Sequence, residues 1–180
     1  MTSDASQDDE LLTGDRIRSL LKDLGDELAH LGESGELFLV GGAAMALGYD
    51  AREATRDIDA LFEPKLVIYE AAARIAGREQ LPSDWLNDAM KGFLHGDDAD
   101  RRLVIEHPAL KVYVASPRYL LAMKLLSARI ERDTDDIALL LGLAGITRVE
   151  DALDLVEAAY GKGRISVKTS LIVEAILADS

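Results

Sequence analysis

Two short segments decide how this chain folds: Leu39-Val-Gly-Gly-Ala-Ala-Met-Ala-Leu-Gly48 and Thr55-Arg-Asp-Ile-Asp59. The first segment continues an apolar run that starts at Leu37, and a short apolar run ended by a glycine pair predicts a buried strand. The small, helix-prone residues after the glycines predict a short helix over residues 43–47. Beyond the second segment, apolar and other residues alternate in a way that predicts a second strand over residues 57–62.

This alternation places the carboxylates of Asp57 and Asp59 on one face of the second strand. Residues at i and i+2 of a strand lie about 7 Å apart at Cα, so both carboxylates can bind one divalent cation. Gly41 and Gly42 remove side chains where a phosphate would approach, and they expose backbone N–H groups at the start of a helix. The arrangement therefore predicts phosphoryl or nucleotidyl transfer, in which a metal ion and positioning do most of the work.

The rest of the chain predicts an α+β fold, in which a small mixed sheet is followed by a helical C-terminal half. Residues 1–14 are polar and acidic and are expected to be disordered. The core is expected over residues 15–115, and a helical region packed on it over residues 116–180. In the core, we also expect helices over 15–31, 64–78 and 85–93 and strands over 101–106 and 110–115. The C-terminal half is expected to contain helices over 117–130, 133–143 and 167–177, and a further helix that starts with a capping box at 147–150 and ends at 159.

Composition narrows the class of protein. A length of 180 residues suits one domain, or one domain with a helical appendage. The absence of cysteine excludes disulfides and cysteine-ligated zinc. No apolar run is long enough to span a membrane, and the N-terminus lacks a signal-peptide core, so we expect a cytoplasmic protein with no membrane partner. The net charge of −13 disfavours non-specific binding to nucleic acid.

The two opening segments resemble the first motif of the DNA polymerase β-type nucleotidyltransferase superfamily, and within it the small prokaryotic proteins around the AbiEii toxin and related minimal nucleotidyltransferase toxins. The run from Ser116 to Arg129 is similar to that group's helix with an inward lysine, which is Lys124 here. Arg132-Asp-Thr-Asp-Asp-Ile137 resembles the Arg-Asp-x-x-Asp run that follows the helix. The resemblance spans about residues 37–141.

The resemblance implies an activity. A nucleoside monophosphate would pass from an NTP, with Mg²⁺ as cofactor, to an acceptor for which tRNA 3′ ends are the first candidate. It also implies the toxin of a toxin–antitoxin pair, with the cognate antitoxin protein as a partner. Asp57 and Asp59 would hold Mg²⁺, Gly41 and Gly42 would face the triphosphate, and Lys124 would reach the nucleotide phosphates as a point charge.

Two further residues are assigned through the resemblance. Asp136 is the later acid of the second run, and its implied role is that of an orienting residue or a base, which completes a catalytic set of Asp57, Asp59, Lys124 and Asp136. Arg129 is assigned with Lys124 to nucleotide binding. Because Arg129 and Asp133 stand at i and i+4, a simple ion pair between them is the alternative.

Departures from the family pattern leave alternatives open. The second glycine stands where many members have serine, and the strands expected over 101–106 and 110–115 offer no third carboxylate apart from Glu106. Lys124 could be a surface lysine, and the acids at 133–136 could mark the solvated N-terminus of a helix with Asp133 as its N-cap. At the level of function, the alternatives are a nucleotide- or partner-binding protein without turnover and a small-molecule transferase of the aminoglycoside type.

Overall fold

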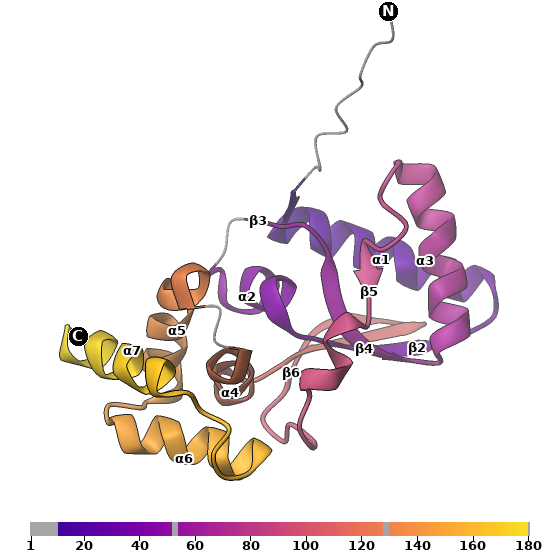
Figure 1. The fold of residues 1–180 in the computed structure, drawn as a ribbon. Coiled ribbons are helices and arrows are strands. Elements are labelled where there is room, and N and C mark those ends of the chain that lie inside the picture. The colour runs from indigo at the N-terminus through magenta and orange to yellow at the C-terminus, as the bar shows by residue number, and fades with distance from the viewer. Residues whose placement is uncertain (1–10, 52–53, 128–129, 180) are drawn as a thin grey trace, which may run out of the picture. The chain divides into compact units, whose positions relative to one another are not determined.

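The computed structural model describes residues 11–51, 54–127 and 130–179. The chain divides into two compact units (Figure 1). The first unit contains residues 1–89 and 103–113, and the second contains residues 90–102 and 114–180. No helix within the described ranges is long and apolar enough to cross a membrane.

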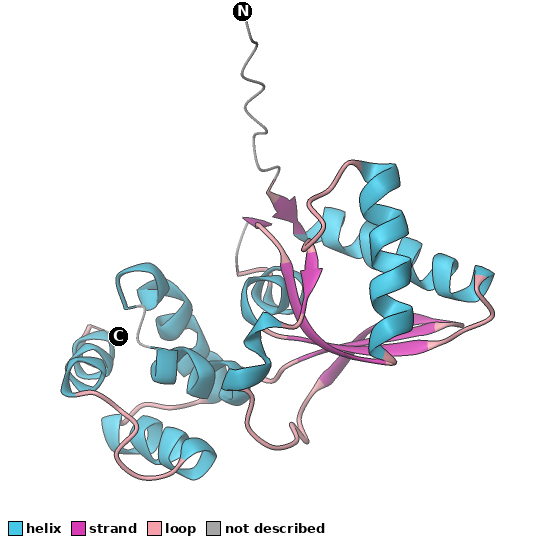
Figure 2. Cartoon of the chain, turned by 45° about the vertical axis from the view of Figure 1, so that its right-hand side comes forward, coloured by secondary structure: helices cyan, strands magenta, loops and turns pink. Residues whose placement is uncertain are grey.

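The first unit is built on a five-stranded mixed sheet in the order β5-β4-β2-β7-β6 (Figure 2). β4 runs antiparallel to β2, with Leu37 opposite Phe62, and parallel to β5, with Asp59 opposite Asn87. The mixed sheet and the helices confirm the predicted α+β class. The strands are β2 (Gly35–Leu39), β4 (Ile58–Glu63), β5 (Leu86–Asn87), β6 (Arg102–His107) and β7 (Leu110–Val114).

Alternation along the strands builds the core of this unit. Ile58, Ala60 and Phe62 of β4 are buried, whereas Asp59 and Leu61 between them are only partly buried. The buried side faces helices, since the Phe62 ring packs edge-on against Tyr69 of α3 at a centroid distance of 4.9 Å. The carboxylate side of β4 is therefore the side away from α3. The helices of this unit are α1 (Gly14–His30), α2 (Gly41–Tyr49) and α3 (Lys65–Glu79).

Residues directly before α1 form a strand, which corrects the disorder predicted through residue 14; residues 1–10 of that prediction lie outside the described residues. Leu12 and Thr13 form β1, which pairs antiparallel with β3 (Ala54–Thr55). Leu12 is 1% exposed, and the Thr13 side chain caps α1 by accepting a hydrogen bond from the Arg16 N–H. Two contributions stabilise this segment. Burial removes the Leu12 side chain from water, and the Thr13 hydroxyl satisfies a backbone N–H at the start of α1.

The predicted helix over residues 85–93 is confirmed only in its second half, as the short 3-10 helix η1 (Ala89–Phe93). Its first half is wrong, because Leu86 and Asn87 form the strand β5. Trp85 explains the difference, since its ring is 1% exposed and its Nε1–H donates to the Ala72 carbonyl of α3 at 3.0 Å. Tertiary packing of this one side chain places the next two residues beside β4, where the Ile58 N–H donates to the Trp85 carbonyl at 2.7 Å.

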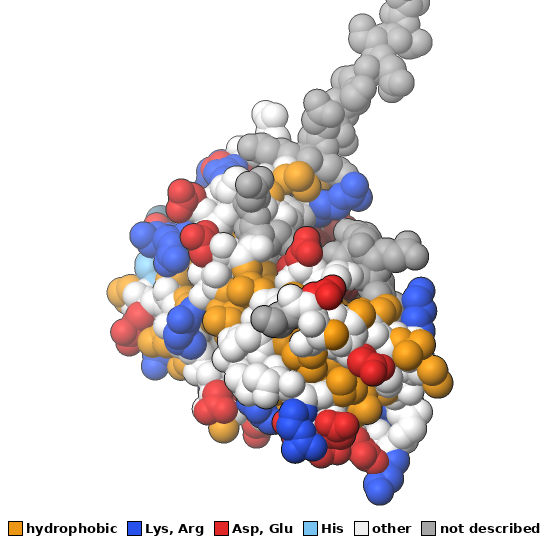
Figure 3. All heavy atoms as spheres, turned by 90° about the vertical axis from the view of Figure 1, so that its left-hand side faces the viewer, with side chains coloured by type: hydrophobic (Ala, Val, Ile, Leu, Met, Phe, Trp, Pro, Cys, Tyr) orange, Lys and Arg blue, Asp and Glu red, His pale blue; other side chains and the backbone are white. Residues whose placement is uncertain are grey.

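The second unit is a cluster of helices: α4 (Pro117–Ser127), α5 (Ile130–Ala144), α6 (Val149–Tyr160) and α7 (Val167–Ala178). Ser116 caps α4 as predicted, since its Oγ accepts from the Tyr119 N–H at 3.3 Å. The predicted capping box before α6 is wrong, because the N-cap is Arg148 and no side chain caps that end. Figure 3 shows one face of the molecule, where hydrophobic side chains lie among charged ones. The exposed hydrophobic side chains of this unit include Leu143 of α5 and Val167 and Leu171 of α7.

An aromatic cluster ties residues 90–102 to the helices of the second unit. The His95 ring stacks on Tyr119 at a centroid distance of 4.1 Å, and its Nδ1 lies 2.9 Å from the Tyr160 hydroxyl. Because that hydroxyl donates to the Phe93 carbonyl at 2.6 Å, His95 Nδ1 is the donor to Tyr160. Burial lowers the pKa of His95 and raises the pKa of Tyr160.

Candidate active site

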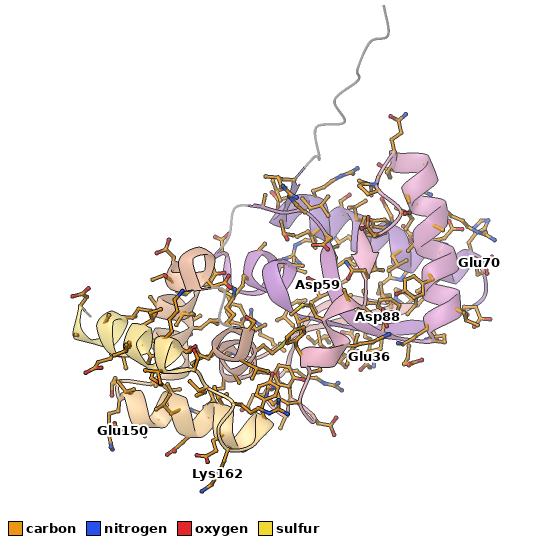
Figure 4. All side chains as sticks on the ribbon, in the orientation of Figure 1. Glu36, Asp59, Glu70, Asp88, Glu150 and Lys162 are labelled. Carbon is orange, nitrogen blue, oxygen red and sulfur yellow. The ribbon has the colours of Figure 1, made fainter. Side chains whose placement is uncertain are left out.

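The two predicted metal ligands lie together at one end of β4. Asp57 immediately precedes the strand, and Asp59 is its second residue. Both side chains are partly buried and stand on the side of the strand opposite Ile58 and Ala60, as the alternation predicts. Figure 4 shows Asp59 next to α2. Two half-buried carboxylates on one strand face supply hard oxygen donors at i and i+2.

Gly41 brings the start of α2 against Asp59. Its φ of +62° lies in the left-handed region, and a Cβ at this position would stand 3.2 Å from Asp59 Oδ2. The Val40 N–H donates to the Asp59 carbonyl at 3.0 Å, which fixes the two segments to each other. Gly42 is partly buried in the first turn of α2, and no side chain caps that helix end. A larger residue here would crowd Asp59 Oδ2, and the left-handed backbone favours glycine.

This contact has an electrostatic consequence. A helix N-terminus attracts anions, because its first N–H groups lack partners within the helix. A carboxylate that stands beside it would repel a phosphate unless a cation lies between them. The end of α2 and Asp59 together therefore suit a phosphate that arrives with a divalent cation.

Asn87 lies beside the two carboxylates and was not predicted from the sequence. It lies on β5 opposite Asp59, and its Nδ2 donates to Asp57 Oδ2 at 2.9 Å. It was missed because the segment around it reads as a helix. No local pattern could have found it, because its place beside Asp57 depends on the pairing of β5 with β4.

The remaining predicted residues lie in the second unit and form a cluster of their own. Lys124 Nζ stands 2.9 Å from Asp133 Oδ1 and 2.8 Å from Asp136 Oδ2. The three side chains are between 9% and 13% exposed, so the surface-lysine alternative for Lys124 is wrong. Asp133 is not an N-cap, because α5 already begins at Ile130. Arg129 lies outside the described residues.

Comparison with protein families decides the class. The family described as "Nucleotidyltransferase of unknown function (DUF6036)" matches residues 16–156. The chain belongs to this family. Comparisons with curated proteins and with solved structures gave no match. The match confirms the nucleotidyltransferase level of the resemblance, whereas the narrower likeness to AbiEii toxins stays a prediction.

The donor set of this nucleotidyltransferase fits Mg²⁺. The ion commonly takes one or two protein carboxylates and completes its octahedron with water and substrate phosphate oxygens. Asp57 and Asp59 would provide those two carboxylates, and Gly41 places no side chain against Asp59 Oδ2. The described residues contain no group of three His, Cys, Asp or Glu side chains suited to hold a metal ion. Substrate oxygens would therefore have to supply much of the coordination.

A second ion-paired group anchors the chain just past Asn87. Asp88 accepts from Lys65 Nζ at 2.6 Å and from the Tyr69 hydroxyl at 2.9 Å, both on α3. The hydrogen bond to Asp88 raises the pKa of Lys65, whereas burial is the main cause of the raised pKa of Tyr69. The loop after β5 is thus attached to α3 through side chains.

Proposed function

We propose that this nucleotidyltransferase moves a nucleoside monophosphate from an NTP to a hydroxyl group of an acceptor, with Mg²⁺ held by Asp57 and Asp59. One observation carries the proposal: two carboxylates share a strand face beside the left-handed Gly41 at the start of α2. In this arrangement, the helix end binds phosphate oxygens and the carboxylates bind the cation that accompanies them.

The reaction is a substitution at the α-phosphorus. The acceptor oxygen forms a bond to phosphorus, the bond between phosphorus and the α–β bridging oxygen breaks, and pyrophosphate leaves with that electron pair. The hydroxyl proton passes to a carboxylate of the protein or to water. Mg²⁺, when bound, neutralises charge on the phosphates and polarises the phosphoryl group. The contribution of Gly41 and Gly42 is to let backbone N–H groups approach the phosphates.

The acceptor and the biological role rest on the resemblance. It supports an RNA acceptor, with tRNA 3′ ends first, and a toxin that a cognate antitoxin restrains. A chain of net charge −13 has no electrostatic attraction for RNA at long range. Recognition of tRNA would then depend on local contacts at its end. Lys124 and Asp136 keep their implied roles in phosphate binding and proton transfer as predictions.

A second function is favoured by one observation. The strand beside β4 carries an amide, that of Asn87, next to Asp57. A site with two carboxylates and a neutral neighbour could bind a metal–nucleotide complex without turning it over. The chain would then act as a nucleotide-binding protein.

Both functions are tested by one labelling experiment. Purified protein is incubated with Mg²⁺, each α-³²P-labelled NTP in turn, and total tRNA. The site variant is Asp57→Asn/Asp59→Asn. The matched control is Asp151→Asn/Asp154→Asn, which removes the same charge from two exposed positions of α6.

The outcomes separate the candidates. Label on RNA with the wild type and the control, and none with the site variant, supports the proposed transfer and identifies the nucleotide. No label on any acceptor, together with Mg²⁺-dependent NTP binding that the site variant loses, supports the binding function instead. Equal labelling by the wild type and the site variant would remove Asp57 and Asp59 from the chemistry.

A further inference from the structure

We propose that Asn87 is a positioning residue of the metal site: its amide orients Asp57 and keeps the place beside the two carboxylates neutral. The inference rests on the proposed function, because it concerns the same cation. It adds a residue that neither the motifs nor the family description assigns.

The hydrogen bonds of Asn87 fix which end of its amide faces Asp57. Oδ1 accepts from the Ala89 N–H at 2.9 Å, so this end must be the carbonyl oxygen. The opposite end, Nδ2, donates to Asp57 Oδ2 at 2.9 Å and to the Asp84 carbonyl at 3.3 Å. A flipped amide would turn an oxygen toward two acceptors and an N–H toward a donor. The donor to Asp57 is therefore set by the surrounding chain.

The segment that carries Asn87 is held on both sides. Before it, Trp85 is buried and donates to Ala72 of α3. After it, Asp88 is bound by Lys65 and Tyr69 of the same helix. Two residues of strand pairing alone would fix the register of β5 only weakly. With these contacts to α3, the Asn87 amide is a rigid support for a side chain that would bind a cation.

A carboxylate cannot replace this amide without a change in the site. Aspartate at position 87 would direct an oxygen at Asp57 Oδ2, and both groups would carry negative charge at hydrogen-bond distance. A bound cation would relieve that repulsion. The amide instead donates one hydrogen bond to Asp57 Oδ2 and adds no charge beside it. The structure thus favours a site of moderate charge that depends on substrate phosphate to complete the coordination of its cation.

The test measures metal binding without any reaction. Mn²⁺ alone, as the probe for Mg²⁺, is titrated into the full chain and followed by electron paramagnetic resonance. Asn87→Leu removes the amide at similar size, and Asn87→Ser removes it with a smaller side chain in case leucine disturbs folding. Asn87→Asp exchanges the amide for a charge. Gln80→Glu makes the same exchange at the C-cap of α3, and Asp57→Asn/Asp59→Asn removes the ligands.

We expect the Kd for Mn²⁺ to rise about 10-fold or more in Asn87→Leu and Asn87→Ser, the cost usual for partners of metal ligands. Asn87→Asp should bind at least as tightly as the wild type, and Gln80→Glu should match it. Wild-type affinity in both Asn87→Leu and Asn87→Ser would overturn the positioning role. An equal loss of Mn²⁺ affinity in Asn87→Leu and Asn87→Asp would also overturn it, because that result indicates only damage to the fold. If the Asp57/Asp59 variant keeps the wild-type Kd, or the wild type binds no Mn²⁺, the metal site of the proposed function fails as well.

Discussion

Replacing Lys124 by methionine should destabilise the second unit strongly. The Lys124 ammonium is the shared partner of Asp133 and Asp136, at 2.9 Å and 2.8 Å. Methionine keeps most of the side-chain volume and removes the charge. The variant takes this cation away from both carboxylates, in a place where water reaches them poorly.

The size of the effect follows from burial. The three side chains are 12%, 13% and 9% exposed, so this cluster lies close to the buried limit. Removing one partner of a buried ion pair usually costs about 3–5 kcal/mol, because the remaining charge is left without compensation. We expect about 3 kcal/mol here, the lower end, since a little water still reaches each group. Asp133→Asn/Asp136→Asn, added to Lys124→Met, should recover about 2 kcal/mol by removing the two charges that the Lys124 ammonium neutralises in the wild type.

Urea unfolding followed by circular dichroism at 222 nm measures this free energy. Fluorescence of Trp85, the only tryptophan, reports on the first unit in the same samples. The control is Lys168→Met, which removes an exposed lysine from α7. A Lys124→Met variant within about 1 kcal/mol of the wild type would refute the reasoning, because a surface pair contributes no more than that. The result also decides how a loss of activity in Lys124 variants is to be interpreted.

Three further predictions concern glycines and a histidine. Gly41→Ala should cost about 1–2 kcal/mol in the free energy of unfolding for its left-handed backbone and should also weaken Mn²⁺ binding; wild-type values in urea unfolding and metal titration would contradict this. In Gly25→Ala, the new Cβ would stand 2.6 Å from the His107 ring, so we expect the free energy of unfolding to fall by about 1–3 kcal/mol. Gly77→Ala, which has open space around the new Cβ, should instead raise it by about 0.5–1 kcal/mol. A rise in both variants would show that the His107 ring moves to accommodate the Cβ. Because burial lowers the pKa of His95 below its unfolded value, the unfolded state binds a proton at higher pH than the folded state does. The free energy of unfolding should therefore fall as the pH drops below about 6.5, and His95→Gln should reduce this pH dependence in urea unfolding.

Local patterns were sufficient to predict four strands of the five-stranded sheet and the place of Asp57 and Asp59 at the start of β4. The alternation after Asp57 predicted which side of β4 is buried, because the apolar residues of an alternating strand can all face the core in only one orientation. The glycine pair predicted the turn into α2. Each of these features depends on neighbours within a few residues, which is the range that sequence patterns report.

Long-range contacts explain what the patterns did not show. The segment at Trp85 has the composition of a short helix, yet one buried ring and its hydrogen bond to Ala72 hold it beside β4 instead. Asn87 could not be placed in the site without that strand. Likewise, the partners of Lys124 stand nine and twelve residues away, and the pairing depends on how α4 packs on α5.

The pairing of β1 with β3 bears on how fragments of this protein should be cut. The family match starts at residue 16, which lies beyond both Leu12 and Thr13. A fragment trimmed to that boundary would leave Ala54 and Thr55 without their partner strand, directly before the segment that carries Asp57 and Asp59. It would also remove the residue that caps α1. The limits of recognisable similarity and the limits of a stably folded site are therefore different here, and the second lie at least four residues further toward the N-terminus.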